Sequence, residues 1–331
     1  MMNVSQRSVS ETGLGTAAGY FTLDRYLMGL AGTVAGRYTM TQTADGPSGI
    51  ANCLKLACTT ADTSIGADEQ GLIVQKFEGQ DLQRICKGTA DAKPVTVSFY
   101  VKGDSAATYV VALEDADNTR HCAFTFDVTT SWNRITQTFP ADTTGAFGDD
   151  NAYSLALVWH LHAGSNLTSG TLQTTWAGTT HANRAAGIDS FFSATSRTFF
   201  LTGVQMEVGS VATPFENESY AETLQKCQRY FQLPQTWTAH SDGSTATAWK
   251  IQYTFAVPMR ASPTIGTKGT PTVVKLNANA AGPTTISVVP TANTAGFTGN
   301  SFTTMATGAG ADAATNTPYV GEAGFTASAE L

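Results

Sequence analysis

The sequence predicts an all-β protein with three parts: an N-terminal jelly-roll β-sandwich, a short linking helix and a C-terminal β domain. Three observations lead to this prediction. The 331-residue chain is rich in Gly, Thr and Ala, and it carries many short runs in which apolar and polar residues alternate. Each run is bounded by Gly, Asp, Asn, Ser or Pro, which is the pattern of antiparallel strands joined by turns. A pattern typical of a helix stands out at one place only.

The clearest alternation lies at 95–102, where Val97, Phe99 and Val101 are expected to face a core while Tyr100 faces outward. The runs at 109–113 and 122–128 flank an Asp- and Asn-rich turn and predict a hairpin. Further strands are expected at 53–58, 71–77, 133–139, 153–162 and 198–206. Strands at these short intervals favour a two-sheet sandwich.

In the run 153–162, Leu155, Leu157 and Trp159 occupy one face, so period two predicts that His160 and His162 point outward to solvent. An H-x-H pair with His181 as a third ligand would be one way to bind zinc. Two solvent-facing histidines explain the pattern better, because no cysteine and no short fixed spacing supports a zinc site.

A capping box at Ser219 and Glu222 opens the one helical pattern, which continues through Leu224, Cys227 and Phe231 and is ended by Pro234. We therefore expect a helix at 219–231. The expected domains are an arm at 1–19, the sandwich at 20–216, the linking segment at 217–233 and a β domain at 234–331, with strands at 248–257, 272–276 and 284–289.

Charge falls sharply beyond the helix. The last 100 residues carry eight charged side chains, whereas the first 231 carry 37. A free surface with so few charges is unusual for a small soluble domain. The sequence thus predicts that copies of the C-terminal part cover one another in a homo-oligomer.

Composition also excludes several classes of protein. The net charge of -7 removes the electrostatic basis for binding nucleic acid or an anionic membrane. No apolar stretch approaches the roughly 20 residues that span a bilayer, and the polar start of the chain has no signal-peptide core. Five scattered cysteines without a C-x-x-C pair are expected to be small buried apolar residues. We expect synthesis in a cytoplasm.

A specific motif lies at 199–216, FFLTGVQMEVGSVATPFE, followed by CQRYF at 227–231. It closely resembles a signature of tail-fibre-like and other fibrous virion proteins of tailed bacteriophages. The resemblance covers roughly 20–231 and includes 95–102, Trp132, 161–166 and Trp176, although Tyr100 stands where the family usually has Trp. The run at 257–264 also resembles one that often follows this module.

The resemblance implies a sandwich similar to carbohydrate-binding modules, a virion location, contacts with other virion proteins and host surface glycan as ligand. Phage fibres commonly join three chains, so a homotrimer is the implied oligomer. Sugars stack their C–H faces on aromatic rings and need planar polar partners. The candidate binding residues are Tyr100, Trp132, His160, His162 and Trp176. Trp132 and Trp176 could equally close the ends of the sandwich.

No cofactor is expected, apart from a possible structural calcium bound by Asp24 and Glu207, as in similar sandwich modules. Paired acidic residues lie in turn-like contexts, and no nucleophile, phosphate or dinucleotide motif is present, so a non-enzymatic protein is expected. The leading interpretation is a phage fibre protein that attaches to host glycan. A capsid-decorating or cement protein, or a fibre segment without ligand, is the alternative, and a depolymerase is the third.

Overall fold

The structure, a computed structural model, describes residues 2–234, 236–241, 248–268, 272–275, 289–290, 301–307, 318–322 and 324–331. Two compact units divide the chain. Met1–Tyr220 together with Leu331 form the first unit, and Ala221–Glu330 form the second. Both consist mainly of antiparallel strands, which confirms the predicted all-β class.

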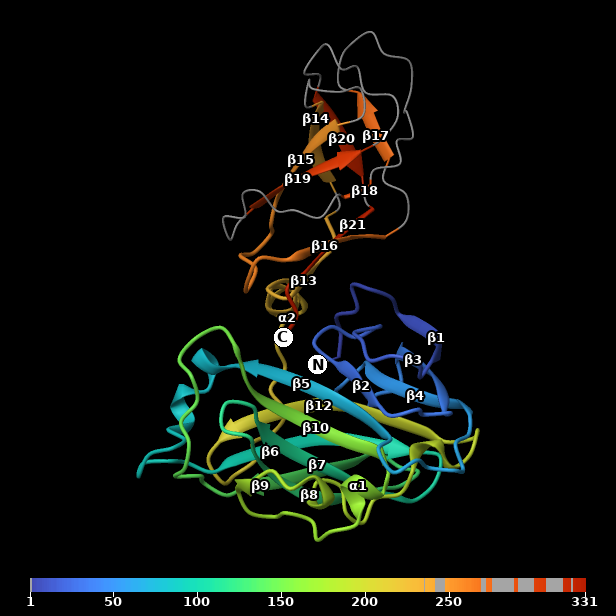
Figure 1. The fold of residues 1–331 in the computed structure, drawn as a ribbon, viewed down its shortest axis with the longest axis vertical. Helices are drawn as coiled ribbons and strands as arrows, with labels where there is room; N and C mark the ends of the chain where they lie inside the picture. The colour runs from blue at the N-terminus through green and yellow to red at the C-terminus, as the bar shows by residue number, and fades with distance from the viewer. Residues whose placement is uncertain are drawn as a thin grey trace. The chain divides into compact units, whose positions relative to one another are not determined.

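The first unit is a sandwich of two six-stranded sheets that lie face to face (Figure 1). The first sheet has the order β1 (Ser10–Leu14), β3 (Arg37–Thr43), β4 (Cys53–Thr60), β12 (Thr198–Val208), β6 (Val95–Gly103) and β9 (Asn133–Phe139). The second sheet has the order β11 (Ala177–Gly178), β8 (Arg120–Val128), β7 (Ala107–Asp115), β10 (Tyr153–Ala163), β5 (Gln70–Glu78) and β2 (Leu27–Ala31).

Strand order identifies the jelly roll. Its eight strands are β4, β5, β6, β7, β8, β9, β10 and β12, and in one sheet the order is first, eighth, third, sixth. In the other sheet it is fifth, fourth, seventh, second. Successive strands thus cross repeatedly between the sheets, as in two interlocked Greek keys. The segment expected to be an N-terminal arm contributes β1 to this sandwich, and Met2 and Val4 are buried.

Period-two alternation builds the core as expected. Phe99 of β6 meets Phe126 of β8 and Trp159 of β10 in edge-on contacts, with ring centroids 5.2 and 5.6 Å apart. Trp159 is fully buried. The expected turn after β7 is also present, because the Asp115 carboxylate accepts the backbone N–H of Asn118 at 3.0 Å. This burial of large rings between two sheets is the main favourable contribution to folding.

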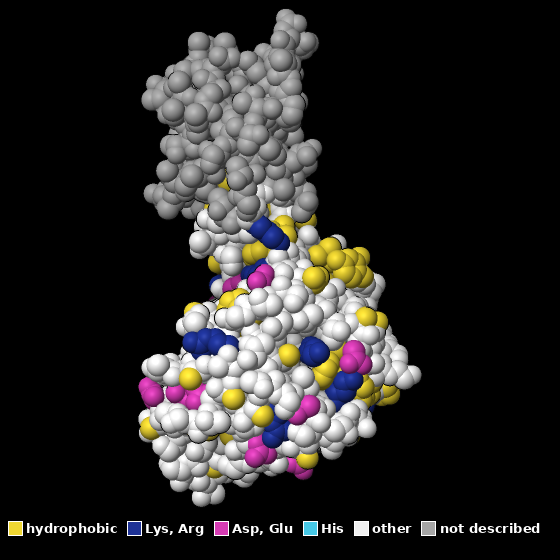
Figure 2. Space-filling view, turned by 90° about the vertical axis from the view of Figure 1, so that its right-hand side faces the viewer, with side chains coloured by type: hydrophobic (Ala, Val, Ile, Leu, Met, Phe, Trp, Pro, Cys, Tyr) yellow, Lys and Arg dark blue, Asp and Glu magenta, His cyan; other side chains and the backbone are white. Residues whose placement is uncertain are grey.

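Short helical turns connect the strands: η1 (Gly79–Asp81), η2 (Gln83–Ile85), α1 (Ser165–Thr168), η3 (His181–Asn183) and η4 (Phe191–Ser193). All five cysteines are free, and Cys86 is the one that is partly exposed. On the face of the sandwich shown in Figure 2, acidic and basic side chains lie interspersed among uncharged atoms. Within the described residues, no helix has the length and apolar character to cross a membrane.

The second unit begins at Ala221, within α2 (Tyr220–Gln228), at the place where the sequence predicts a helix. The helix ends three residues earlier than expected, because Phe231 and Gln232 pair with a strand instead. A three-stranded sheet joins β13 (Phe231–Gln232), β21 (Phe325–Ser328) and β16 (Thr264–Thr267). A six-stranded sheet has the order β17 (Thr272–Lys275), β20 (Pro318–Glu322), β14 (Thr236–Ser241), β15 (Ala248–Thr254), β19 (Ser301–Thr307) and β18 (Val289–Pro290). Most of the expected strand at 284–289 lies outside the described residues.

Candidate functional site

The outer face of the first sheet carries the candidate site. Along β6, Phe99 and Val101 point into the core, so Tyr100 and Lys102 stand on the opposite face. The register places Tyr100 between Thr202 of β12 and Arg134 of β9. Tyr100 is partly exposed, in agreement with its predicted outward orientation.

Trp132 lies in the loop between β8 and β9 and also reaches this face. Its ring meets Phe200 of β12 edge-on, with centroids 6.2 Å apart, and its indole Nε1 donates to the backbone oxygen of Asp45 at 3.1 Å. Lys102 Nζ lies 5.2 Å from the centroid of the Trp132 ring and 4.7 Å from that of Phe200. The Asp45 carboxylate accepts from the same ammonium group at 2.8 Å. These contacts hold a partly exposed indole in one orientation.

Tyr100 is held by a neighbouring cation and by a glycine. The Arg134 guanidinium lies 5.9 Å from the centroid of the ring and donates to Ser98 Oγ at 3.0 Å. Gly203 has a φ of 58°, and a Cβ added there would lie 2.8 Å from Tyr100 Cδ2. Glycine therefore lets the ring approach the backbone of β12 closely.

The motif at 199–216 serves the fold. After β12, the chain turns back onto the strand: Gln205 Nε2 donates to Thr213 Oγ1 at 3.0 Å, and the backbone N–H of Glu216 donates to Gln205 Oε1 at 2.8 Å. Thr213 Oγ1 donates to the Glu207 carboxylate at 2.6 Å. These polar residues of the motif therefore fix the end of the sandwich.

Asp24 and Glu207, the proposed calcium ligands, take part in separate networks. Asp24 is buried, accepts from Gln6 Nε2 at 2.6 Å and forms an ion pair with Arg7 at 3.3 Å. The Glu207 carboxylate accepts hydrogen bonds from the backbone N–H and the hydroxyl group of Thr213. Within the described residues, neither belongs to the group that gathers three metal-ligating side chains. The geometry therefore gives no support to a calcium shared by these two carboxylates.

Trp176 has a structural position. It packs against the main core, and its Nε1 donates to the backbone oxygen of Pro140 at 2.8 Å. Its ring also lies 5.4 Å from Nζ of Lys87, a buried lysine. Trp176 thus closes one part of the sandwich, which is the second of the two roles that the sequence left open.

The predicted solvent exposure of His160 and His162 is wrong, because both are fully buried. His160 does lie on the outer side of the second sheet, beside Val158, but Leu172 and Ile188 from the segment between β10 and β12 pack over the apolar cluster there. Its Nε2 lies 3.5 Å from the Glu114 carboxylate. Arg184, which belongs to the same covering segment, forms an ion pair with Glu114 at 2.5 Å. Alternation alone does not indicate that a long connection covers a sheet.

His162 is turned to the other side of the sheet by a β-bulge. His160 pairs with Leu72 and His162 with Gly71, so Leu161 has no partner in β5. The extra residue shifts the alternation, and the His162 ring packs edge-on against Phe192 with centroids 5.2 Å apart. His181 is exposed. The three histidines therefore do not form one ligand set.

Sequence reasoning missed Lys102, Arg134, Asp45 and Phe200. A signal for Lys102 was present, since it follows Tyr100 by two residues and shares its face. Asp45 could not be found, because it reaches Trp132 across 87 positions of sequence. A separate hollow of about 510 Å³ lies near Asp68, Asn166 and His181, but its lining includes no Phe, Tyr or Trp. The outer face of the first sheet is therefore the better candidate for binding a sugar.

No protein-family model matches the chain, and no curated protein matches it. Solved structures show remote likenesses. The enzymatically active domain of tailspike protein 4 of bacteriophage CBA120 is 10% identical with a TM-score of 0.32; the match covers 56% of this chain and 19% of that one. The family 11 carbohydrate-binding module of Clostridium thermocellum, in complex with a mixed-linked tetrasaccharide, is 12% identical with a TM-score of 0.29, over 62% of this chain and 99% of that one. The xylan-binding domain CBM22-2 of Paenibacillus barcinonensis is 14% identical with a TM-score of 0.29, over 56% and 91%.

Proposed function

We propose that the sandwich binds carbohydrate without cleaving it, through the outer face of the first sheet. One observation carries the proposal: two partly exposed aromatic rings, Tyr100 and Trp132, are held by fixed contacts on the outer side of one sheet. Aromatic rings offer a flat apolar surface on which the C–H face of a sugar ring can stack.

The charged groups on the same face suit sugar hydroxyls. Lys102 and Arg134 are donors beside the two rings, and the Asp45 carboxylate is an acceptor beside Trp132. Planar guanidinium and carboxylate groups match pairs of adjacent hydroxyls. Because an open sheet buries less of a ligand than an enclosed pocket does, each site should bind weakly.

The wider setting that we propose is a tailed-phage virion, in which the chain is a fibre protein that attaches to host surface glycan and contacts other virion proteins. The motif at 199–216 and 227–231 supports this setting. A homotrimer formed through the C-terminal part would present several weak sites together, and effective concentration then raises the overall avidity. A capsid-decorating or cement role without ligand remains the competing function.

The binding test uses the intact full-length protein on a glycan array, followed by titration with host polysaccharide. Trp132→Ala and Tyr100→Ala should each lower the affinity by about tenfold or more, the loss typical of removing an aromatic anchor. Tyr220→Ala is the matched control, since Tyr220 is a 58% exposed tyrosine on α2. Absence of binding to any host envelope material would favour the cement role.

The protein is proposed to have no hydrolytic activity. Asp45, the carboxylate beside Trp132, is engaged by the Lys102 ammonium at 2.8 Å, whereas a glycosidase needs two carboxylates on either side of the bond. Incubation with purified host polysaccharide should release no reducing ends. Release that disappears in an Asp45→Asn variant would instead show a depolymerase.

The oligomer is tested by light scattering. Full-length protein should be an oligomer at micromolar concentration, because the low charge of the last 100 residues leaves too little polarity for a free surface, and the resemblance to phage fibres implies a trimer. A chain that ends near Gln228 should be monomeric, because it retains the compact unit Met1–Tyr220 and lacks the strands of the second unit. A full-length chain that stays monomeric would contradict the proposed trimer.

A further inference from the structure

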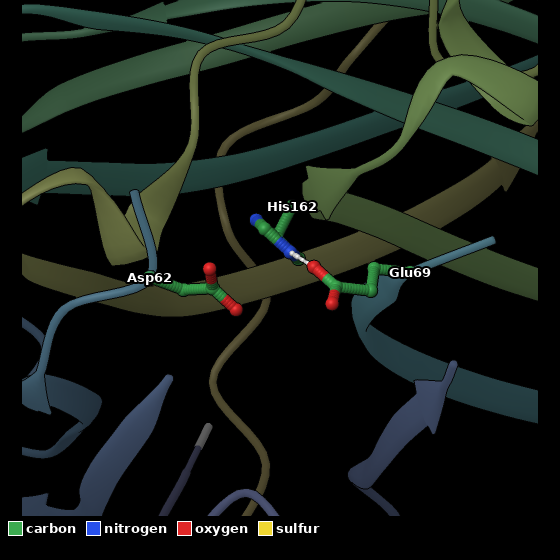
Figure 3. A group of neighbouring side chains, drawn as sticks. All are labelled: Asp62, Glu69 and His162. Carbon is green, nitrogen blue, oxygen red and sulfur yellow. Dashed lines mark hydrogen bonds and ion pairs between the residues drawn. The ribbon is translucent and has the colours of Figure 1, made fainter. Parts of the chain in front are cut away.

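Three side chains with metal-ligating groups meet at the end of the second sheet, away from the proposed binding face. Asp62 follows β4, Glu69 directly precedes β5 and His162 lies near the end of β10. Their polar groups face one another (Figure 3), and one ligand atom from each residue lies within 4.8 Å of the other two. All three residues are buried.

The surrounding protein already orients these groups. His162 Nε2 lies 3.2 Å from Glu69 Oε2, and its Nδ1 lies 2.8 Å from Ser190 Oγ. The Asp62 carboxylate accepts the backbone N–H of Ala35 at 2.7 Å and that of Ser64 at 3.2 Å. Glu69 Oε1 accepts no hydrogen bond from the described residues, although its side chain is only 6% exposed. One carboxylate oxygen is therefore available within the cluster.

Charge in the cluster is unbalanced. Within the described residues, neither Asp62 nor Glu69 forms an ion pair with Lys or Arg. Two carboxylates that are packed together in a buried place without a neighbouring Lys or Arg favour a bound cation.

We propose that Asp62, Glu69 and His162 bind one divalent transition-metal ion, with Zn²⁺ as the best match. Two carboxylate oxygens and one imidazole nitrogen form a mixed donor set that suits zinc, whereas Ca²⁺ takes oxygen ligands only. Ligand atoms around a tetrahedral zinc lie roughly 3.4 Å apart, given metal–ligand distances near 2.1 Å. The pair formed by His162 and Glu69 already has this spacing.

Ser190 has the position of a supporting residue. A metal-bound imidazole usually donates its second N–H to a neighbouring acceptor, which fixes the tautomer and the orientation of the ring. Ser190 Oγ stands at this place beside Nδ1 and also caps η4 by accepting the backbone N–H of Phe192 at 3.1 Å. The bulge at Leu161 brings His162 to this side of β10.

The metal ion is structural. It joins the connection between β4 and β5, which carries Asp62 and Glu69, to the end of β10 across 93 positions of sequence. A metal ion that links segments so distant in sequence stabilises the folded state, and the stabilisation increases with the affinity of the folded protein for the metal. A water molecule or Glu69 Oε1 can supply the fourth ligand.

The test begins with full-length protein stripped by a chelator, then titrated with ZnCl₂ by calorimetry and with CoCl₂ by visible spectroscopy. We expect one Zn²⁺ per chain, a rise in the melting temperature of about 5–10 °C at zinc a hundredfold above Kd, and visible cobalt bands. Glu69→Gln keeps the size of the side chain and should weaken zinc binding at least about tenfold. His162→Gln should abolish the cobalt bands.

His181→Ala is the control, because His181 is an exposed histidine outside the cluster. It should leave zinc affinity and the cobalt spectrum unchanged. A folded wild-type protein that binds no zinc would overturn the proposal. Zinc binding that Glu69→Gln leaves intact, or a thermal response to CaCl₂ alone, would overturn it as well.

Discussion

Replacing Lys87 by Met should strongly destabilise the sandwich. The Lys87 side chain is 2% exposed, and its ammonium group lies 2.5 Å from Asp115 and 3.1 Å from Asp142. It also donates to the backbone oxygens of Thr144 and Gly145 at 2.9 and 2.8 Å. One cation thus satisfies two buried carboxylates and joins the end of β7 to the segment after β9.

The magnitude follows from what the substitution leaves behind. Asp142 keeps the Arg120 guanidinium at 2.8 Å, so its charge remains compensated. Asp115 keeps only the neutral donors of Asn118, and its side chain is fully buried. Removing one member of a buried ion pair costs about 3–5 kcal/mol, because the other charge remains unpaired. Methionine approximately preserves the volume, so the loss is mainly electrostatic.

The assay is urea unfolding at pH 7, followed by circular dichroism, with the free energy of unfolding as the result. Lys93→Met is the matched control, because Lys93 is exposed in the same connection, and it should change stability by less than about 0.5 kcal/mol. Adding Asp115→Asn to Lys87→Met should restore part of the loss, since a neutral amide needs no counter-charge. A Lys87→Met loss below about 1 kcal/mol, or no rescue by Asp115→Asn, would refute the reasoning.

Two further predictions concern residues that only the structure brings together. Burial would raise the pKa of Glu114, but His160 and Arg184 outweigh it and lower the pKa to about 2. Glu114 therefore contributes stability above pH 4.5, and this contribution is lost as the pH falls toward 2. Glu114→Gln should remove about 3 kcal/mol of this pH dependence, which acid titrations followed by fluorescence would measure. Gly203→Ala should cost about 1–3 kcal/mol in urea unfolding, because its φ is positive and the new Cβ would lie 2.8 Å from Tyr100 Cδ2. Gly13→Ala, where φ is 69° and the space is open, should cost less, and equal losses would count against the contact with Tyr100.

Local pattern was sufficient for the strands and for much of the core. Alternation at 95–102 placed Phe99 inward and Tyr100 outward, because successive side chains of a strand point to opposite faces whatever the sheet later contacts. The turn after Asp115 was likewise local, since the Asp115 side chain accepts a nearby backbone N–H, and the helix begins at Tyr220, directly after Ser219.

The sequence by itself thus determined the all-β class, most of the strands and the outward position of Tyr100, since these depend on neighbours within a few residues. Only the tertiary structure decided which outward faces stay open and which groups meet. A single bulged residue, Leu161, turned His162 to the inner side of the sheet, and the segment between β10 and β12 covered His160. Glu69 meets His162 and Asp45 meets Trp132 across 93 and 87 positions. Such long-range contacts depend on the strand register and on the paths of the connecting segments. Both are set by the packing of the whole sandwich rather than by local propensity.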